Sequence, residues 1–131
     1  MDFCRTLGSI SENDLKEVGG KALGLARMHR HGLPVPPAIV LPVHAMESFL
    51  VHNRLQSELL KTGSHSEEEL ASARERILSG SWPDAMKSDI LQAAMSLGPF
   101  GVGLAVRSSA VDEDGKSHSF AGQYATFLNA V

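Results

Sequence analysis

The sequence has one cysteine, few aromatic residues and no long apolar run. With Cys4 alone, a disulfide within the 131 residues is excluded and a cysteine-based zinc site is not indicated. No stretch approaches the roughly 20 apolar residues that a membrane-spanning helix requires, and the N-terminus lacks the basic and apolar regions of a signal peptide. These absences are typical of a reducing compartment, and we expect a cytoplasmic location.

Basic charge is also scarce. Lys and Arg number 12 against 15 Asp and Glu, which gives a net charge of -3 and a pI of about 6.0. Such a chain offers no basic field to a phosphate backbone, so nucleic acid is not an expected partner. Hydrophobic residues make up 43% and charged residues 21%, which is typical of a folded domain rather than a disordered chain.

In the first third of the chain, the spacing of apolar residues predicts a helix followed by a strand. Apolar residues recur at helical spacing over 21–31, and Gly32 follows as a stop. The predicted apolar face consists of Ala22, Leu25 and Met28. The glycine pair 19–20 interrupts any longer helix. Three prolines then force an extended path, and 38–41 has the pattern of a buried strand.

Three further helices and two strands are expected after it. The helical segments, each bounded by a capping residue, a glycine or a proline, are 44–60, 66–80 and 83–98. Their predicted apolar faces are Met46, Phe49, Leu50, Leu55 and Leu59, then Leu70, Ala73 and Ile77, then Met86, Ile90, Ala94 and Leu97. Strands are expected at 103–108 and 124–131, with a polar loop at 109–123 between them.

This order of elements predicts mixed α/β layers, an α+β fold class. The length suits a single core. Because the sequence stops directly after an apolar strand, residues 1–131 are expected to form a single partial domain.

Three short segments could carry chemistry, and the first is Gly19-Gly20-Lys21 at a helix start. Unpaired backbone N–H groups and the helix dipole attract an anion there, and lysine adds a positive charge, so phosphate is the expected ligand. The full nucleotide-binding pattern, with Ser or Thr after the lysine, is absent because Ala22 occupies that position. On spacing alone, a tight turn with a solvated lysine is favoured over a phosphate site.

The second segment, 106–110, ends a predicted strand. Arg107 lies there beside the hydroxyls of Ser108 and Ser109. The donor fork of arginine matches phosphate oxygens, and strand ends commonly carry ligand groups in α/β folds. The alternative is a surface ion pair between Arg107 and Asp112 or Glu113.

The third segment is 119–123, where small residues precede Gly122 and Gln123. Small residues let backbone N–H groups approach a ligand closely, as a phosphate-covering loop requires. The alternative is a simple turn between two strands. The acidic run 112–114 could hold a hydrated metal, but neighbouring carboxylates in a loop are more often solvated, and no metal ligand is predicted in this chain.

The order of these segments, with a proline-rich lead-in to a strand between them, is similar to that of a known family. The chain resembles the N-terminal nucleotide-binding region of the phosphoenolpyruvate synthase and pyruvate phosphate dikinase family, which includes rifamycin phosphotransferases. The stretches that carry the resemblance are VGGKALGLARMHRHGLPVPPAIVL, 18–41, and LAVRSSAVDEDGKSHSFAGQYATFLNAV, 104–131. One departure is Ala38-Ile39, where the family usually has Pro-Gly-Phe.

The resemblance implies the first subdomain of an ATP-grasp-like nucleotide-binding domain. It implies that ATP, with Mg2+, lies between two subdomains and gives phosphate to a histidine on a separate domain, which passes it to a small acceptor such as pyruvate. Lys21 and Arg107 then correspond to catalytic cations that contact the ATP phosphates, and Gly122 belongs to the flap over them. The implied nucleotide-binding residues are Gly19, Gly20, Lys21, Arg107, Ser108, Gly122 and Gln123.

By the same resemblance, the rest of the machinery is expected beyond Val131. The missing parts are the metal ligands, the adenine pocket, the phosphohistidine domain and the barrel that binds phosphoenolpyruvate or pyruvate. None of the six histidines in this chain has the surroundings of a phosphate carrier. The chain is therefore expected to be incomplete as an enzyme.

Two other interpretations stay open. A stand-alone nucleotide-binding or regulatory module would keep the fold without transferring phosphate, although half of a two-subdomain cleft should hold ATP poorly. A non-functional fragment would fold marginally or associate through an uncovered apolar face. The phosphate acceptor and the oligomeric state are not encoded in these residues.

Overall fold

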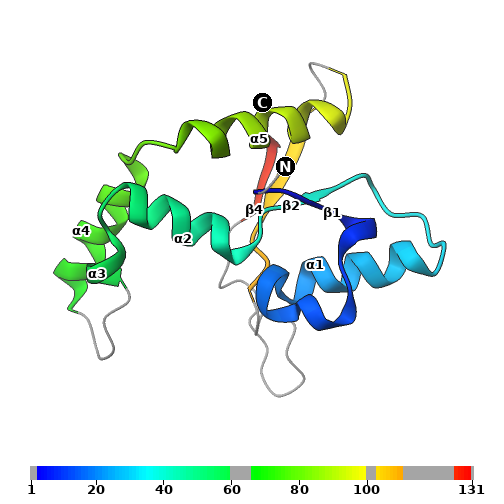
Figure 1. Ribbon diagram of the computed structural model, residues 1–131, viewed down its shortest axis with the longest axis horizontal. Coiled ribbons are helices and arrows are strands. Elements are labelled where there is room, and N and C mark those ends of the chain that lie inside the picture. Colours follow the sequence, from blue (N-terminus) through cyan, green and yellow to red (C-terminus); the bar gives the residue numbers. More distant parts are fainter. Residues whose placement is uncertain (1–2, 60–65, 100–102, 111–125, 131) are drawn as a thin grey trace.

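The computed structural model describes residues 3–59, 66–99, 103–110 and 126–130. In chain order the elements are β1 (Arg5–Thr6), the 3-10 turns η1 (Leu7–Ser9) and η2 (Glu12–Asp14), α1 (Leu15–Arg30), β2 (Ile39–Val40), α2 (Val43–His52), α3 (Gln56–Leu59), α4 (Glu67–Leu78), α5 (Asp84–Ser96), β3 (Leu104–Arg107) and β4 (Thr126–Ala130). The described strands form two separate antiparallel pairs, β1 with β2 and β3 with β4 (Figure 1). This mixture of helices and strands agrees with the expected α+β class. Within these ranges, no helix has both the length and the apolar character needed to cross a bilayer.

Helix α1 consists of two helical segments joined at a kink. Gly19 has φ 82° and ψ 169°, outside the helical region, so the helix that begins at Leu15 breaks there and restarts. Glycine adopts such a φ at low cost because it has no β-carbon. Gly32, with φ 73°, follows the last helical residue, Arg30. The predicted glycine interruption and the predicted stop are both confirmed.

The buried face of α1 differs from the predicted one. Ala22 is buried as expected, but Leu23 and Ala26 are buried beside it, and Met28 is 41% exposed. The first core cluster consists of Leu7, Ile10, Val18, Ala22, Leu23, Ala26 and Val40. The contact with η1 and β2 decides which stripe of α1 turns inward, and helical spacing alone does not contain that information.

The N-terminal strand β1 is not predicted by the sequence pattern. It pairs with β2 so that Arg5 lies opposite Val40 and Thr6 lies opposite Ile39. The strand predicted at 38–41 is therefore confirmed but shorter than expected. Two residues are too few to show an alternating pattern, and the partner of β1 lies far along the chain.

The helical stretch predicted over 44–60 is divided between α2 and α3. Arg54 has φ 57°, outside the right-handed helical region, and so separates the two helices. Leu55, which is 1% exposed, follows this turn, and its N–H donates to Leu50 O at 2.8 Å. The prediction of one continuous helix is wrong here, because the turn at Arg54 divides it. Of its predicted apolar face, Phe49, Leu50 and Leu55 are buried, whereas Met46 is 46% exposed.

Helices α4 and α5 agree with their predicted positions. Ser66 Oγ accepts a hydrogen bond from Glu69 N at 3.1 Å, which is the N-terminal cap expected for α4. In α5 the buried residues are Met86 and Ala93, whereas the predicted Ala94 is half-buried.

A second core cluster is formed by residues of α2, of the turn before α3 and of α5. It consists of Ala45, Phe49, Leu50, Leu55 and Met86. Phe3 packs against this cluster, whereas Leu7 belongs to the first cluster, so the N-terminal segment links the two. In Figure 1, α1 lies on one side of the molecule and α3 and α4 lie on the other.

The last described elements, β3 and β4, form an antiparallel pair. Leu104 lies opposite Ala130 and Arg107 lies opposite Thr126, with an irregular register between them. In the view of Figure 1 the pair lies between α5 and α1. The two strands predicted for this part of the chain are confirmed, and β3 ends beside the kink of α1.

Candidate functional site

The kink of α1 and the end of β3 are in direct contact. Lys21 Nζ donates to Ser108 O at 2.9 Å, and Gly20 N donates to Ala110 O at 3.0 Å. The fold thus brings the glycine–lysine segment to the arginine–serine segment, although they are far apart in the sequence. Two of the three segments that the sequence singles out therefore form one junction.

Ser109 occupies the break in α1. Its hydroxyl donates to Val18 O at 2.7 Å and accepts from Ala22 N at 2.9 Å. A β-carbon on Gly19 would lie 1.8 Å from Ser109 O, so the Ser109 backbone approaches this closely only because residue 19 has no side chain. Glycine is required here both for its φ and for this contact.

Two N–H groups at this helix start are bonded within the protein. The Gly20 N–H is taken by Ala110 O and the Ala22 N–H by Ser109 Oγ. For these two groups, the expectation of unpaired donors that attract an anion is wrong, because the end of β3 supplies their acceptors. The positive charge at the junction comes from Lys21, whose side chain is half-buried.

Ser108 differs from its neighbour Ser109 in how its side chain is bonded. Its backbone oxygen accepts from Lys21 Nζ. Its hydroxyl is buried and, among the side chains that the structure describes, is a buried polar group without a hydrogen-bond partner. An unpaired buried hydroxyl costs about 1–3 kcal/mol, so a further partner at Ser108 would stabilise the junction.

Arg107 is the last residue of β3, and its side chain is exposed. It immediately precedes the residue whose carbonyl Lys21 contacts. The third segment, with Gly122 and Gln123, lies outside the described residues, as does the acidic run 112–114 that could pair with Arg107. Of the two expected phosphate-binding cations, Lys21 therefore bonds within the junction and Arg107 lies next to it, while the expected flap lies outside the described residues.

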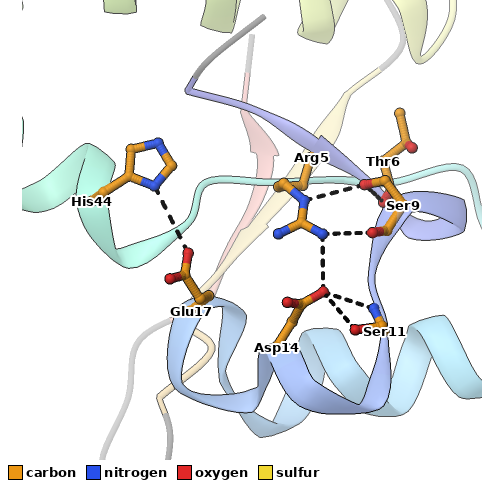
Figure 2. Close-up of polar contacts among 7 residues, drawn as sticks. All are labelled: Arg5, Thr6, Ser9, Ser11, Asp14, Glu17 and His44. Carbon is orange, nitrogen blue, oxygen red and sulfur yellow. Dashed lines mark hydrogen bonds and ion pairs between the residues drawn. The ribbon is translucent and has the colours of Figure 1, made fainter.

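A polar cluster holds the turn that leads into α1 (Figure 2). Arg5 Nη2 donates to Asp14 Oδ2 at 3.0 Å, and the same oxygen accepts from Ser11 N at 2.8 Å. Glu17, in the first turn of α1, lies 4.0 Å from the ring nitrogen of His44 in α2. These contacts connect β1, η2 and α2 to the helical turn that ends at the kink.

Two carboxyl groups near this turn have lowered pKa values. The backbone N–H of Ser11, with the Arg5 guanidinium, lowers the pKa of Asp14. The Arg27 guanidinium, 2.6 Å from the Glu12 carboxylate, lowers the pKa of Glu12. Both carboxyls are ionised at neutral pH and hold η2 against its neighbours.

A separate cavity of about 590 Å³ opens between α2, α3 and the residue before α5. It is lined by Glu47, Ser48, Leu50, Val51, His52, Gln56 and Pro83. None of the predicted site residues that the structure describes lines it, so it is separate from the junction of Lys21 and Ser108.

Ser109 is the residue of this junction whose role the sequence analysis misses. The pattern groups it with Ser108 as a possible ligand group and does not predict its contact with α1. One signal does exist, because a glycine inside a helical pattern leaves helix donors and acceptors in need of partners. A serine hydroxyl that follows a strand can accept a hydrogen bond from one helix N–H and donate one to one helix carbonyl.

The family model described as "Pyruvate phosphate dikinase, AMP/ATP-binding domain" matches residues 15–131. The matched range contains the kink at Gly19 and both cations, Lys21 and Arg107. The chain belongs to this family.

Several curated proteins are similar to it. The "Prodigiosin synthesizing transferase PigC" of Serratia marcescens is 42% identical over 86% of this chain and 12% of its own length. The "Uncharacterized phosphotransferase YvkC" of Bacillus subtilis is 33% identical over 91% of this chain and 13% of its own length. The "Phosphoenolpyruvate synthase" of Aeropyrum pernix is 36% identical over 94% of this chain and 17% of its own length. The chain thus spans less than a fifth of each of these relatives.

Proposed function

We propose that this chain is the ATP-binding N-terminal part of a cytoplasmic phosphotransferase. ATP gives phosphate to a histidine on another domain, and the phosphohistidine passes it to a small acceptor such as pyruvate. The chain contributes the first subdomain of an ATP-grasp-like domain, as a single partial domain over 1–131. Membership of an AMP/ATP-binding family supports nucleotide binding. The names of the Bacillus and Aeropyrum relatives support phosphoryl transfer.

One observation carries the proposal: the Lys21 ammonium is bonded to the strand end that bears Arg107. The distance from Lys21 Nζ to Ser108 O is 2.9 Å, and Ser108 directly follows Arg107. The Lys21 ammonium is thus held next to the residue that follows Arg107, whose guanidinium is exposed at the same end of β3. A phosphate chain, with several negative oxygens, is a ligand that can use both kinds of cation.

In the proposed mechanism Lys21 and Arg107 act electrostatically. Phosphoryl transfer needs cations that stabilise the negative charge on the transferring group and its leaving group. The Ser108 hydroxyl, which is buried and has no hydrogen-bond partner among the described residues, donates to a phosphate oxygen. Gly122 and Gln123 cover the phosphates from the following loop.

The two glycines of the first segment have a shaping role in this proposal. Gly19 admits the Ser109 backbone, and Gly20 bonds the strand end through its N–H. They hold Lys21 in place next to the phosphates.

Magnesium is assigned to the rest of the protein. In the part of the chain that the structure describes, no three His, Cys, Asp or Glu side chains gather in a way that could hold a metal ion. Mg2+ in nucleotide sites is commonly bound by one or two carboxylates together with the phosphates. The proposal places those carboxylates in the second subdomain.

The test is Lys21→Ala and Arg107→Ala, each made in the complete protein that carries this chain. Loss of one preorganised charge-stabilising group typically costs about 100- to 1,000-fold in rate, and each variant should lose phosphoryl transfer to that extent. The reaction is followed as acid-labile, alkali-stable phosphoprotein formed from ATP labelled in its β- or its γ-phosphate. Circular dichroism checks that each variant is folded.

Matched controls are Lys16→Ala in α1 and Arg74→Ala in α4, which remove the same charges at exposed positions. Both should react at the wild-type rate. Retained turnover in both Lys21→Ala and Arg107→Ala would contradict the proposal. Tight ATP binding by a wild-type protein that forms no phosphoprotein would favour a non-catalytic nucleotide-binding module instead.

A further inference from the structure

We propose that Ser109 is a positioning residue for phosphate binding, an inference that rests on the proposed function. Its hydroxyl replaces the hydrogen bond that α1 lacks at its kink. It thereby fixes Lys21 relative to the strand end that carries Arg107.

The missing bond of α1 can be named. In a continuous helix each N–H donates to the carbonyl four residues earlier, so Ala22 N would bond to Val18 O. The kink at Gly19 opens this bond, and Ser109 Oγ enters it, 2.9 Å from Ala22 N and 2.7 Å from Val18 O. A hydroxyl can donate and accept at the same time, as this position requires. Insertion of a side chain into the helical ladder is also a recognised cause of sharp kinks.

The junction consists of hydrogen bonds between two short segments. Three consecutive residues of the strand end, 108–110, bond to three consecutive residues of the helix start, 20–22. Two of these bonds use backbone oxygens of the strand end, which no substitution removes. The third uses the Ser109 hydroxyl. Among residues 108–110, Ser109 is therefore the one whose bond to residues 20–22 a substitution can remove.

Removing the hydroxyl leaves Val18 O and Ala22 N without their shared partner. The helical turn that includes Lys21 is then held less firmly against the strand end. Misplacement of a functional group by about 1 Å can cost on the order of 100-fold. Threonine keeps the hydroxyl, cysteine keeps a side chain of similar shape with a weak donor and acceptor, and alanine keeps neither. The order of function at position 109 should therefore be Ser and Thr, then Cys, then Ala.

The test compares the binding of ATP and of AMP in Ser109→Ala, Ser109→Thr and Ser109→Cys, made in the complete protein that carries this chain. Calorimetry should show that Ser109→Ala weakens ATP binding about 10- to 100-fold. AMP, with a single phosphate, should be affected much less, and Ser109→Thr should restore ATP binding. The control is Ser96→Ala, which removes another structural hydroxyl bond, from Ser96 Oγ to Ala93 O at 2.6 Å, and should leave both affinities unchanged.

Each other outcome has a defined meaning. Wild-type ATP affinity in Ser109→Ala would overturn the inference and leave the proposed function standing. Equal losses for ATP and AMP that follow a lowered unfolding temperature, or failure of threonine to restore binding, would also overturn it. If Ser109→Ala does not fold, Ser109→Cys decides: a selective loss of ATP affinity supports the inference and unchanged affinity overturns it. A wild-type protein that binds no ATP refutes the proposed function, and the inference with it.

Discussion

Two glycines of α1 experience different constraints. Gly19 has φ 82°, and an added β-carbon would lie 1.8 Å from Ser109 O. Gly24 lies in the same helix, and an added β-carbon there would meet nothing within 4 Å. Glycine in an ordinary helix position is destabilising by about 0.5–1 kcal/mol relative to alanine. The two positions should therefore respond to alanine with opposite signs.

We expect Gly19→Ala to lower the free energy of unfolding by about 2–3 kcal/mol or more, because a strained φ and a backbone clash add. Gly24→Ala should raise it by about 0.5–1 kcal/mol. Urea denaturation of both variants beside the wild type gives the two differences. Equal stability of Gly19→Ala and the wild type would mean that Ser109 does not contact the kink.

At the scale of single residues, the sequence could predict which cations belong to the junction but not that they lie close together. Lys21 and Arg107 can be selected because cationic side chains at a helix start and a strand end fit a phosphate ligand. Their proximity could not be derived from spacing, because it depends on the path of the 85 residues between them. The bridging role of Ser109 is equally a product of tertiary structure.

At the scale of elements, ion pairs hold the turn before α1. The Asp14 carboxylate bonds to Ser11 and Arg5, and the Glu12 carboxylate bonds to Arg27, each with a lowered pKa. A carboxyl whose pKa is lower in the folded state stabilises the fold at pH values above its unfolded pKa. This stabilisation is lost as the pH falls through the folded pKa. The turn should therefore weaken in acid.

We expect Arg27→Gln to lower the unfolding temperature near neutral pH and to lower it by less as the pH falls below the ordinary glutamate pKa of about 4.3, because the contribution of the ion pair is lost as Glu12 becomes protonated. Thermal melts across this range measure the difference. Arg74→Gln on α4 is the control, with an unchanged melting temperature. A difference for Arg27→Gln that persists unchanged at pH 3 would rule out the Glu12 ion pair as its source.

Elements were predictable where local signals are strong. The cap at Ser66 and the apolar spacing of α5 locate two helices correctly, because both signals lie in or directly beside the helix that they define. β1 was missed because its partner β2 lies far along the chain. The turn at Arg54 was missed as well, and beside it Asn53 bonds to the backbone of the distant Ser81. Local propensity and periodicity contain no such information.

At the scale of the whole molecule, the described core is divided into two clusters. One contains residues of α1, and the other contains residues of α2, the turn before α3, and α5. Met86 fills the second cluster with 1% of its surface exposed, whereas Met95 on the same helix is 58% exposed. A single helix thus offers a buried and an exposed methionine for comparison.

We expect Met86→Ala to lower the free energy of unfolding by about 2–5 kcal/mol, the usual cost of a cavity in a packed core. Met95→Ala should change it by no more than about 0.5 kcal/mol. Denaturant titration followed by the fluorescence of Trp82, which packs edge-on against Phe49 of the same cluster, reports both. A similar small effect of both substitutions would show that the second cluster is not a packed core.

The hydroxyl that fills the break in α1 also fixes an order of events during synthesis. Val18 and Ala22 leave the ribosome long before Ser109 does, and no earlier residue supplies their shared bond in the native fold. The helix that contains Val18 and Ala22 therefore lacks this bond until Ser109 has been translated. Contacts between such distant residues form slowly. We expect the junction of Lys21 and Ser108 to be among the last parts of the chain to become native, after the helices have already formed.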